Sequence, residues 1–211
     1  MAVVHEAQIH PTKLELLSAW LPGRSWYQEQ AGAELTRVAA CRFDDPAGEV
    51  GVETILVRAG DGPIHHVPLT YRGAPLEGGD DWLVGTMEHS VLGPRWVYDA
   101  CGDPVYVAAL ASAMFAGTGQ AEEFKQAADG RQTPRQPDMF VAGSGANGAG
   151  VPTVAAVRRV VDEDPTLIET DSVALAVVRI VGDDTPSAEV ALTGTWDGQS
   201  MPALLAYARP A

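Results

Sequence analysis

Short runs of β-forming residues, separated by turn residues, are the feature that most limits how this chain can fold. Residues 34–43, 51–59 and 64–72 are rich in Val, Ile, Leu and Thr, and the turn-forming sequences DDPAG and GDGP divide them. Connections this short join antiparallel neighbours, because a parallel pair needs a crossover of a dozen or more residues. The first half of the chain is therefore predicted to form an antiparallel β-meander.

A similar series of runs returns in the second half of the chain. Five segments are matched by later ones of similar sequence: 38–42 by 154–158, 44–46 by 163–165, 57–58 by 178–179, 60–63 by 182–186, and 67–70 by 190–193. The offset changes only at turns, where insertions are tolerated. Because strands draw on a restricted set of residues, similar composition alone is the competing explanation. We interpret the pattern as a duplicated meander, and predict that 38–72 and 154–196 superpose.

Two helices are predicted beside these strands. Thr12 can cap a short N-terminal helix that Pro22 and Gly23 end. Asp103 and Pro104 begin a longer helix over 103–117, whose apolar stripe is formed by Val107, Leu110, Ala111 and Met114. The predicted fold class is α+β: a mainly antiparallel sheet from two repeated β-meanders packed around one central helix, plus the short N-terminal helix.

Length, charge and cysteine content narrow the class of protein. A chain of 211 residues fits one domain, or two small ones sharing a core. Its net charge of −14 repels phosphate backbones and anionic lipids, so we expect neither nucleic acid nor a membrane as partner. The start of the chain lacks the pattern of a signal peptide, and Cys41 and Cys101 are too few for a disulfide framework. A cytoplasmic protein with two buried thiols is expected.

The sequence contains no convincing cofactor or metal motif. The segment GSGANG at 143–148 matches the spacing of a dinucleotide-binding loop, but the residues after it favour a strand instead of the required helix. His65 and His66 are adjacent on a predicted strand, so their side chains point to opposite faces and cannot easily share a metal ion. We therefore expect no cofactor and no metal.

Several segments together resemble a known family. They are HPTKLELLSAWLPGRSWY from residue 10, GVETILVR, VPLTYRGAPLEG, and GPRWVYDACGDP ending at 104. They resemble the N-terminal cap region of bacterial maltokinases over about residues 10–115. The chain is most similar to small free-standing proteins built on this cap, some of them labelled 1,4-alpha-glucan branching protein. The (β/α)8 barrel of a branching enzyme needs about 250 residues and cannot fit here.

The resemblance implies a division of the chain. Residues 1–117 correspond to the cap, 118–138 form a polar connector, and 139–211 form a second β-meander. This last part is either a decayed version of the intermediate strand unit that follows the cap in the kinases, or an internal duplicate of 38–75. In the first case Asn147 matches a loop Asn of the family, and Ala155 replaces the Lys that clamps phosphate.

Independent kinase activity is not expected. Phosphoryl transfer requires a catalytic Asp, a cationic clamp and metal-binding side chains. The chain has no His-x-Asp sequence, neither Lys13 nor Lys125 lies in a predicted strand, and no segment corresponds to the helical lobe that holds the kinase machinery. The resemblance implies a non-catalytic cap-like module that works through a partner enzyme of α-glucan or trehalose metabolism. A sugar-binding protein, or an enzyme of unrecognised type, are the alternatives.

Residues 85–104 contain several side chains that could bind a ligand or take part in a reaction. If the protein binds a sugar, aromatic faces and a few polar groups around this stretch are the expected site. The candidate ligand-binding residues are Tyr71, Arg72, Trp82, Glu88, His89 and Trp96. The alternative is a scaffold, in which Trp96 and Tyr98 alternate along a strand and Asp99 or Asp103 caps the following helix. No catalytic residues are predicted.

Overall fold

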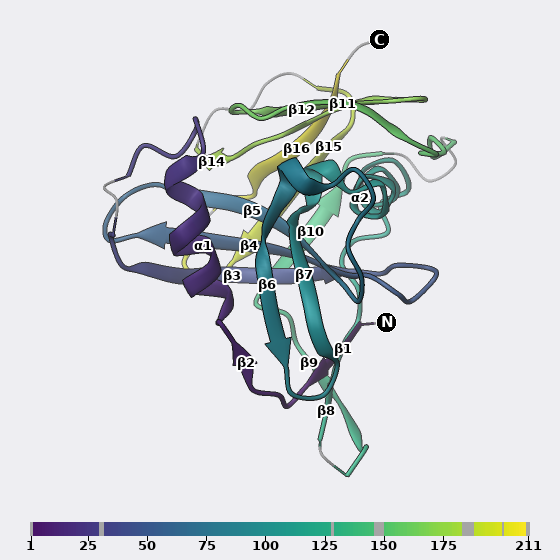
Figure 1. Ribbon diagram of the computed structural model, residues 1–211. Helices are drawn as coiled ribbons and strands as arrows, with labels where there is room; N and C mark the ends of the chain where they lie inside the picture. Colours follow the sequence, from purple (N-terminus) through teal and green to yellow (C-terminus); the bar gives the residue numbers. More distant parts are fainter. Residues whose placement is uncertain are drawn as a thin grey trace.

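A computed structural model describes residues 2–29, 32–127, 129–145, 150–182, 188–199 and 201–209 (Figure 1). Asn147 and the second half of the glycine-rich segment 143–148 lie outside the described residues. The fold is mostly antiparallel β-sheet with short helices, which agrees with the predicted α+β class in its broad outline.

The N-terminal sheet contains the strands predicted from the first half of the chain. Its order is β2 (Ile9–His10), β6 (Leu83–His89), β7 (Gly93–Asp99), β5 (Ile64–Arg72), β4 (Gly51–Ala59) and β3 (Leu35–Phe43), with β14 (Ile180–Val181) also paired with β5. All of these pairings are antiparallel. The predicted meander β3–β4–β5 is therefore confirmed.

The C-terminal sheet is also antiparallel. Its order is β10 (Met139–Gly143), β15 (Ala191–Trp196), β16 (Ala203–Arg209), β13 (Ala174–Val177), β12 (Thr166–Thr170) and β11 (Val157–Val161). Figure 1 shows β11 and β12 at the top of the molecule, on the far side of the N-terminal sheet from β2 and the small sheet around β1.

The predicted repetition of the meander is not confirmed. In the N-terminal sheet β5 lies beside β4, whereas the segment that corresponds to it by sequence begins β15, which pairs with β10 and β16. The difference arises because β4 is one continuous strand, while its counterpart is interrupted at residues 171–173 into β12 and β13. Because of this extra reversal, β13 pairs with β16 and not with β15.

Both predicted helices form with the predicted caps. Helix α1 (Lys13–Trp20) has Thr12 as its N-cap, and Thr12 and Glu15 form a capping box. The 3-10 turn η1 (Leu21–Gly23) follows it. Helix α2 (Pro104–Ala116) has Asp103 as its N-cap and ends at Gly117, whose φ of 64° is the left-handed conformation that glycine adopts without strain.

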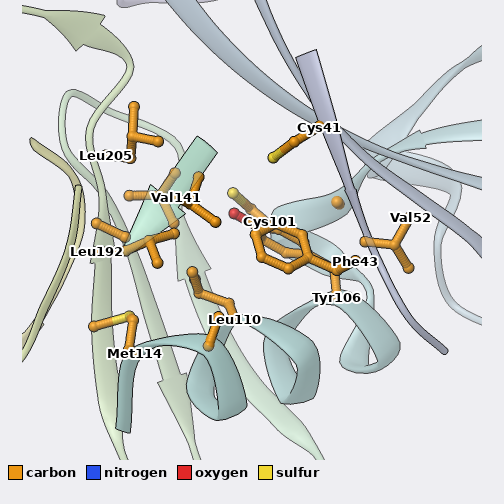
Figure 2. Close-up of a cluster of buried hydrophobic side chains, with 14 of the residues drawn as sticks. Cys41, Phe43, Val52, Cys101, Tyr106, Leu110, Met114, Val141, Leu192 and Leu205 are labelled. Atoms are coloured by element: carbon orange, nitrogen blue, oxygen red, sulfur yellow. The ribbon is translucent and has the colours of Figure 1, made fainter. Parts of the chain in front are cut away.

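Two hydrophobic clusters lie on opposite faces of the N-terminal sheet. Helix α1 and the residues after it cover one face, with Leu17, Leu21 and Trp26 packed on β4 and β5. The other face meets α2 and the C-terminal sheet, as Figure 2 shows for Cys41, Phe43 and Leu192. Burial on both faces explains why β4 and β5 carry nearly continuous apolar runs. Helix α2 forms one wall of the second cluster, and its predicted place at the centre of two meanders is not confirmed.

The segment predicted as a polar connector, 118–138, contains two strands. β8 (Glu123–Gln126) pairs in parallel with β1 (Ala2–His5) and antiparallel with β9 (Gln132–Arg135), and these strands form a small sheet. The sequence indicated no strands here because its residues are mainly polar. Their backbone hydrogen bonds depend on the long-range contact with the N-terminus, which no local pattern reveals.

A buried arginine joins the two sheets. Arg179, between β13 and β14, is fully buried and donates from Nη2 to Asp99 Oδ2 over 2.6 Å and from Nε to Thr166 Oγ1 over 2.7 Å. Its guanidinium also lies 4.9 Å from the centre of the Trp26 ring. Burial opposes the charge of Arg179, but Asp99 and the other anionic groups outweigh burial and raise the pKa of Arg179. Arg179 therefore stays charged and connects the C-terminal sheet to both faces of the N-terminal sheet.

Buried His66 makes the stability of this junction depend on pH. Its Nδ1 lies 2.9 Å from the carbonyl oxygen of Val178, and burial together with Arg179 lowers the pKa of His66 to about 4. An unfolded histidine has a pKa near 6.5, so the unfolded chain takes up this proton first as the pH falls. The stabilising contribution of neutral His66 is therefore complete above about pH 6.5 and is lost progressively toward pH 4.

We expect His66→Gln to reduce this pH dependence. Between pH 6.5 and pH 5 the wild-type protein should lose about 1.5 kcal/mol more unfolding free energy than the variant, because one pKa unit corresponds to about 1.4 kcal/mol and an unfolded histidine is only half protonated at pH 6.5. Urea unfolding at both pH values measures the difference. His10→Gln is the matched control, since it removes an exposed histidine by the same substitution. Equal pH dependence in wild type and His66→Gln would contradict the assignment.

Candidate functional site

A line of polar side chains crosses the face of the N-terminal sheet that carries α1. Cross-strand register places Arg42 opposite Glu53, Gly51 opposite Tyr71, Tyr71 opposite Val97, and Met87 opposite Arg95. Directly opposite residues share a face, and so do residues two apart along a strand. Arg42, Glu53, Tyr71 and Arg95 are therefore brought to one face from four different strands.

Glu53 is the centre of this line and is 6% exposed. It accepts a hydrogen bond of 2.6 Å from Tyr71 Oη and pairs with the Nζ of Lys13, which comes from the first turn of α1. Lys13 Nζ also lies 5.1 Å from the centre of the Tyr71 ring. The three groups satisfy one another, so the buried carboxylate has its compensating charge and hydrogen bond in place.

The protonation states of this cluster follow from its surroundings. Burial opposes ionisation of Glu53, but the positive charges of Lys13 and Arg42 outweigh burial and lower the pKa of Glu53 to about 2. Burial lowers the pKa of Lys13, and burial together with Glu53 raises the pKa of Tyr71. At neutral pH the cluster therefore holds an ionised carboxylate and a protonated phenol.

A cavity of about 400 Å³ opens beside this cluster. Its walls come from β1, the start of α1, the β3–β4 turn, and the β6–β7 hairpin. The polar residues around it include Lys13, Arg42, Tyr71, His89 and Arg95, and the apolar ones include Val3, Ile9, Phe43, Val52, Met87 and Leu92. Its volume lies within the range of small-molecule sites, and its wall combines apolar residues with charged ones.

Two of the six residues predicted from the sequence line this cavity. Tyr71 reaches it from β5 and His89 from the end of β6. His89 Nδ1 accepts hydrogen bonds from the backbone N–H groups of Val91 and Leu92 at 3.2 and 3.1 Å, which orients the ring. The His5 ring packs edge-on against it, with 6.0 Å between ring centres.

The other four predicted residues lie elsewhere. Arg72 binds Asp103 through two hydrogen bonds of 2.7 Å. Trp82 packs so closely on Gly102 that a Cβ atom there would lie 2.2 Å from its ring. Trp96 is paired across the sheet with Arg72, and Glu88 is exposed opposite His10. The cavity therefore brings together only part of the predicted set.

Lys13, Arg42, Glu53 and Arg95 were not singled out from the sequence. Their strands were predicted correctly, except for Lys13, which begins α1. The alternation of β3, β4 and β7 could have placed the three strand residues on one face, but the register that aligns them depends on the whole sheet.

The capping residues were predicted correctly: Asp99 accepts from Cys101 N–H and Asp103 from Val105 N–H.

A second cavity, of about 500 Å³, lies between α2 and the β3–β4 turn. Its lining is mainly small or apolar, including Ala108, Ala109, Pro104 and Val154. None of the six predicted residues contributes to it. Fewer ionisable side chains line it than line the cavity beside Glu53, which is therefore the candidate functional site.

Metal and membrane association were also tested on the described part of the chain. Within it, no three His, Cys, Asp or Glu side chains are grouped as a metal site would require. Neither helix found there has the length and apolar character needed to cross a membrane.

The comparison with known families agrees with the resemblance seen in the sequence. Residues 20–103 match the model of the maltokinase N-terminal cap domain. The match runs from the end of α1 to the residue that caps α2, and it includes β3, β4, β5, β6 and β7. No curated protein matches the chain.

Proposed function

We propose that this protein, whose residues 20–103 are a maltokinase N-terminal cap domain, is a non-catalytic accessory module of α-glucan and trehalose metabolism. It acts by binding an enzyme of that metabolism. The family match carries this proposal, because a cap domain is an accessory part of a maltokinase. The two cysteines, free and buried, are compatible with the reducing cytoplasm in which we place the protein.

The roles of the acidic residues in the matched region support a non-catalytic module. Asp99 is paired with Arg179, Asp103 with Arg72, and Glu53 with Lys13. Each of the three is buried and has a structural partner, so each contributes to folding. We propose that residues 139–211 serve the same end, since their Arg179 and Asp162 hold the cap through Asp99 and Trp26.

The β6–β7 hairpin is the surface that we propose for the partner. Val91 and Leu92 at its tip are 55% and 43% exposed, and both belong to the matched region. Adjacent exposed apolar side chains at the end of a hairpin provide the apolar centre that a protein contact needs, with charged residues around it.

Affinity capture from extracts of the native host tests this proposal. We expect the wild-type protein to retain an enzyme that acts on maltose, trehalose or an α-glucan, and Val91→Glu to lose it. Val151→Glu is the matched control, because Val151 is 40% exposed but lies outside the matched region. Retention of that enzyme by Val91→Glu, or capture of no such enzyme by the wild type, would contradict the proposal.

Sugar binding remains the second candidate. The observation that favours it is the cavity of about 400 Å³, to which the predicted residues Tyr71 and His89 contribute. One face of the Tyr71 ring already packs near Lys13, so stacking by a sugar is limited to the remaining surface. A melting temperature raised by millimolar maltose, and unaffected by anions, would favour this candidate.

A further inference from the structure

The cavity beside Glu53 brings together basic residues from distant parts of an acidic chain. The chain carries 28 acidic and 14 basic residues, yet Lys13, Arg42 and Arg95 all line this one cavity, together with His5 and His89. The acidic residues in its wall include Asp44, Asp45 and Glu49. Which of these charges are already neutralised decides what the cavity can bind.

Two of the acidic groups in or beside the cavity wall already have partners within the fold. Glu53 is held by Lys13 and Tyr71. Asp45 accepts hydrogen bonds from the backbone N–H groups of Ala47, Glu49 and Val50 at 2.9–3.0 Å, so its carboxylate stabilises the β3–β4 turn. These carboxylates have their partners within the fold.

Arg42 and Arg95 differ from these carboxylates because most of their hydrogen-bonding groups have no partner among the described residues. Arg42 and Arg95 are half-buried, and neither forms a salt bridge with another described side chain. Arg42 acts on Glu53 only through space. Arg95 donates a single long hydrogen bond of 3.4 Å to the carbonyl oxygen of the neighbouring Pro94. A guanidinium has five N–H donors in a planar fork, so most of the donors of both side chains are available.

The histidine beside them experiences their positive charge. Burial lowers the pKa of His89, and the charges of His5, Arg95 and Arg42 lower it further. Arg42 on β3 and Arg95 on β7 therefore both act on one point at the end of β6. An anion bound between these two side chains would be attracted by both charges.

We propose that this cavity binds a small organic oxyanion, with its phosphate or carboxylate group held by Arg42 and Arg95. The planar fork of arginine matches the oxygens of either group, and two such forks can hold one anion from both sides. Val3, Ile9, Met87 and Leu92 provide an apolar wall for the rest of the ligand. The proposal shares Leu92 with the protein contact at the hairpin tip, but it rests on Arg42 and Arg95, which that contact does not use.

Calorimetric titration of the full chain with phenyl phosphate and with benzoate tests the proposal and distinguishes the two anionic groups. Maltose is the neutral comparison. We expect at least one anion to bind with a Kd below about 1 mM, and maltose to bind more weakly. Arg95→Gln should weaken binding about tenfold or more, because it removes charge-assisted hydrogen bonds. Arg42→Gln should have a similar effect.

The controls separate binding from folding. Arg95 has no structural ion pair among the described residues, so Arg95→Gln should melt at the wild-type temperature, which the melting curve checks. Arg158→Gln, an exposed substitution on β11 far along the chain, should leave the affinity unchanged. The proposal is overturned if neither anion binds at about 10 mM, if Arg95→Gln binds as the wild type does, or if maltose alone binds.

Discussion

Replacement of Arg179 by Met should lower the free energy of unfolding by about 3–5 kcal/mol, the cost of removing one partner of a buried ion pair. Both Arg179 and Asp99 are completely buried. Methionine fills part of the space, but it leaves Asp99 without its cationic partner and removes the hydrogen bond that Thr166 Oγ1 accepts from Nε. Urea unfolding followed by circular dichroism measures the change.

Arg159→Met is the matched control for this substitution. Arg159 is 66% exposed and lies 3.7 Å from Glu169, so its pair should contribute less than about 1 kcal/mol. A double variant, Arg179→Met with Asp99→Leu, should recover part of the loss, since no buried charge then lacks a partner. If Arg179→Met unfolds at the same urea concentration as Arg159→Met, Arg179 does not join the two sheets as we describe.

Replacement of Asp103 by Ala should lower the free energy of unfolding by about 3 kcal/mol, because one buried carboxylate has three structural roles. It caps α2 by accepting from Val105 N–H at 2.9 Å, it binds both Nε and Nη2 of Arg72, and it accepts from Thr70 Oγ1 at 2.8 Å. The loss therefore combines a helix cap with a buried charge pair.

Thr12→Ala provides the comparison, because Thr12 caps α1 at an exposed position without an ion pair. It should cost about 1 kcal/mol. Asp103→Asn keeps an oxygen that can cap the helix but loses the charge, so its cost should lie between the two. Equal losses for Asp103→Ala and Thr12→Ala would show that the contacts to Arg72 and Thr70 contribute nothing.

Local patterns were sufficient for most of the matched region. The turns between 43 and 64 and the β-branched runs beside them located β3, β4 and β5, and the residue types at 12, 103 and 117 located the caps of α1 and α2. These features depend on neighbours within a few residues, because turn conformation and capping are local hydrogen-bonding problems. The family resemblance, confirmed over residues 20–103, rests on the same stretch.

The candidate cavity was predicted only in part. Tyr71 and His89 were identified because they lie near a stretch rich in aromatic and polar residues. Arg42 and Arg95 were not, since they are separated by more than fifty positions and neither belongs to a recognisable motif. The register of the sheet β6–β7–β5–β4–β3 places them on one face, and both line the cavity there together with residues of β1.

The sequence by itself determined the antiparallel strands of the first half, the caps of both helices and the match of residues 20–103 to the maltokinase cap, because each is encoded in short-range patterns. The tertiary structure alone decided how the second half is arranged. There a turn at 171–173 breaks the expected repeat, β14 joins the N-terminal sheet, and Arg179 reaches Asp99 across eighty positions. Such pairings are selected by the burial of charge and backbone against distant partners, which local residue preferences do not record.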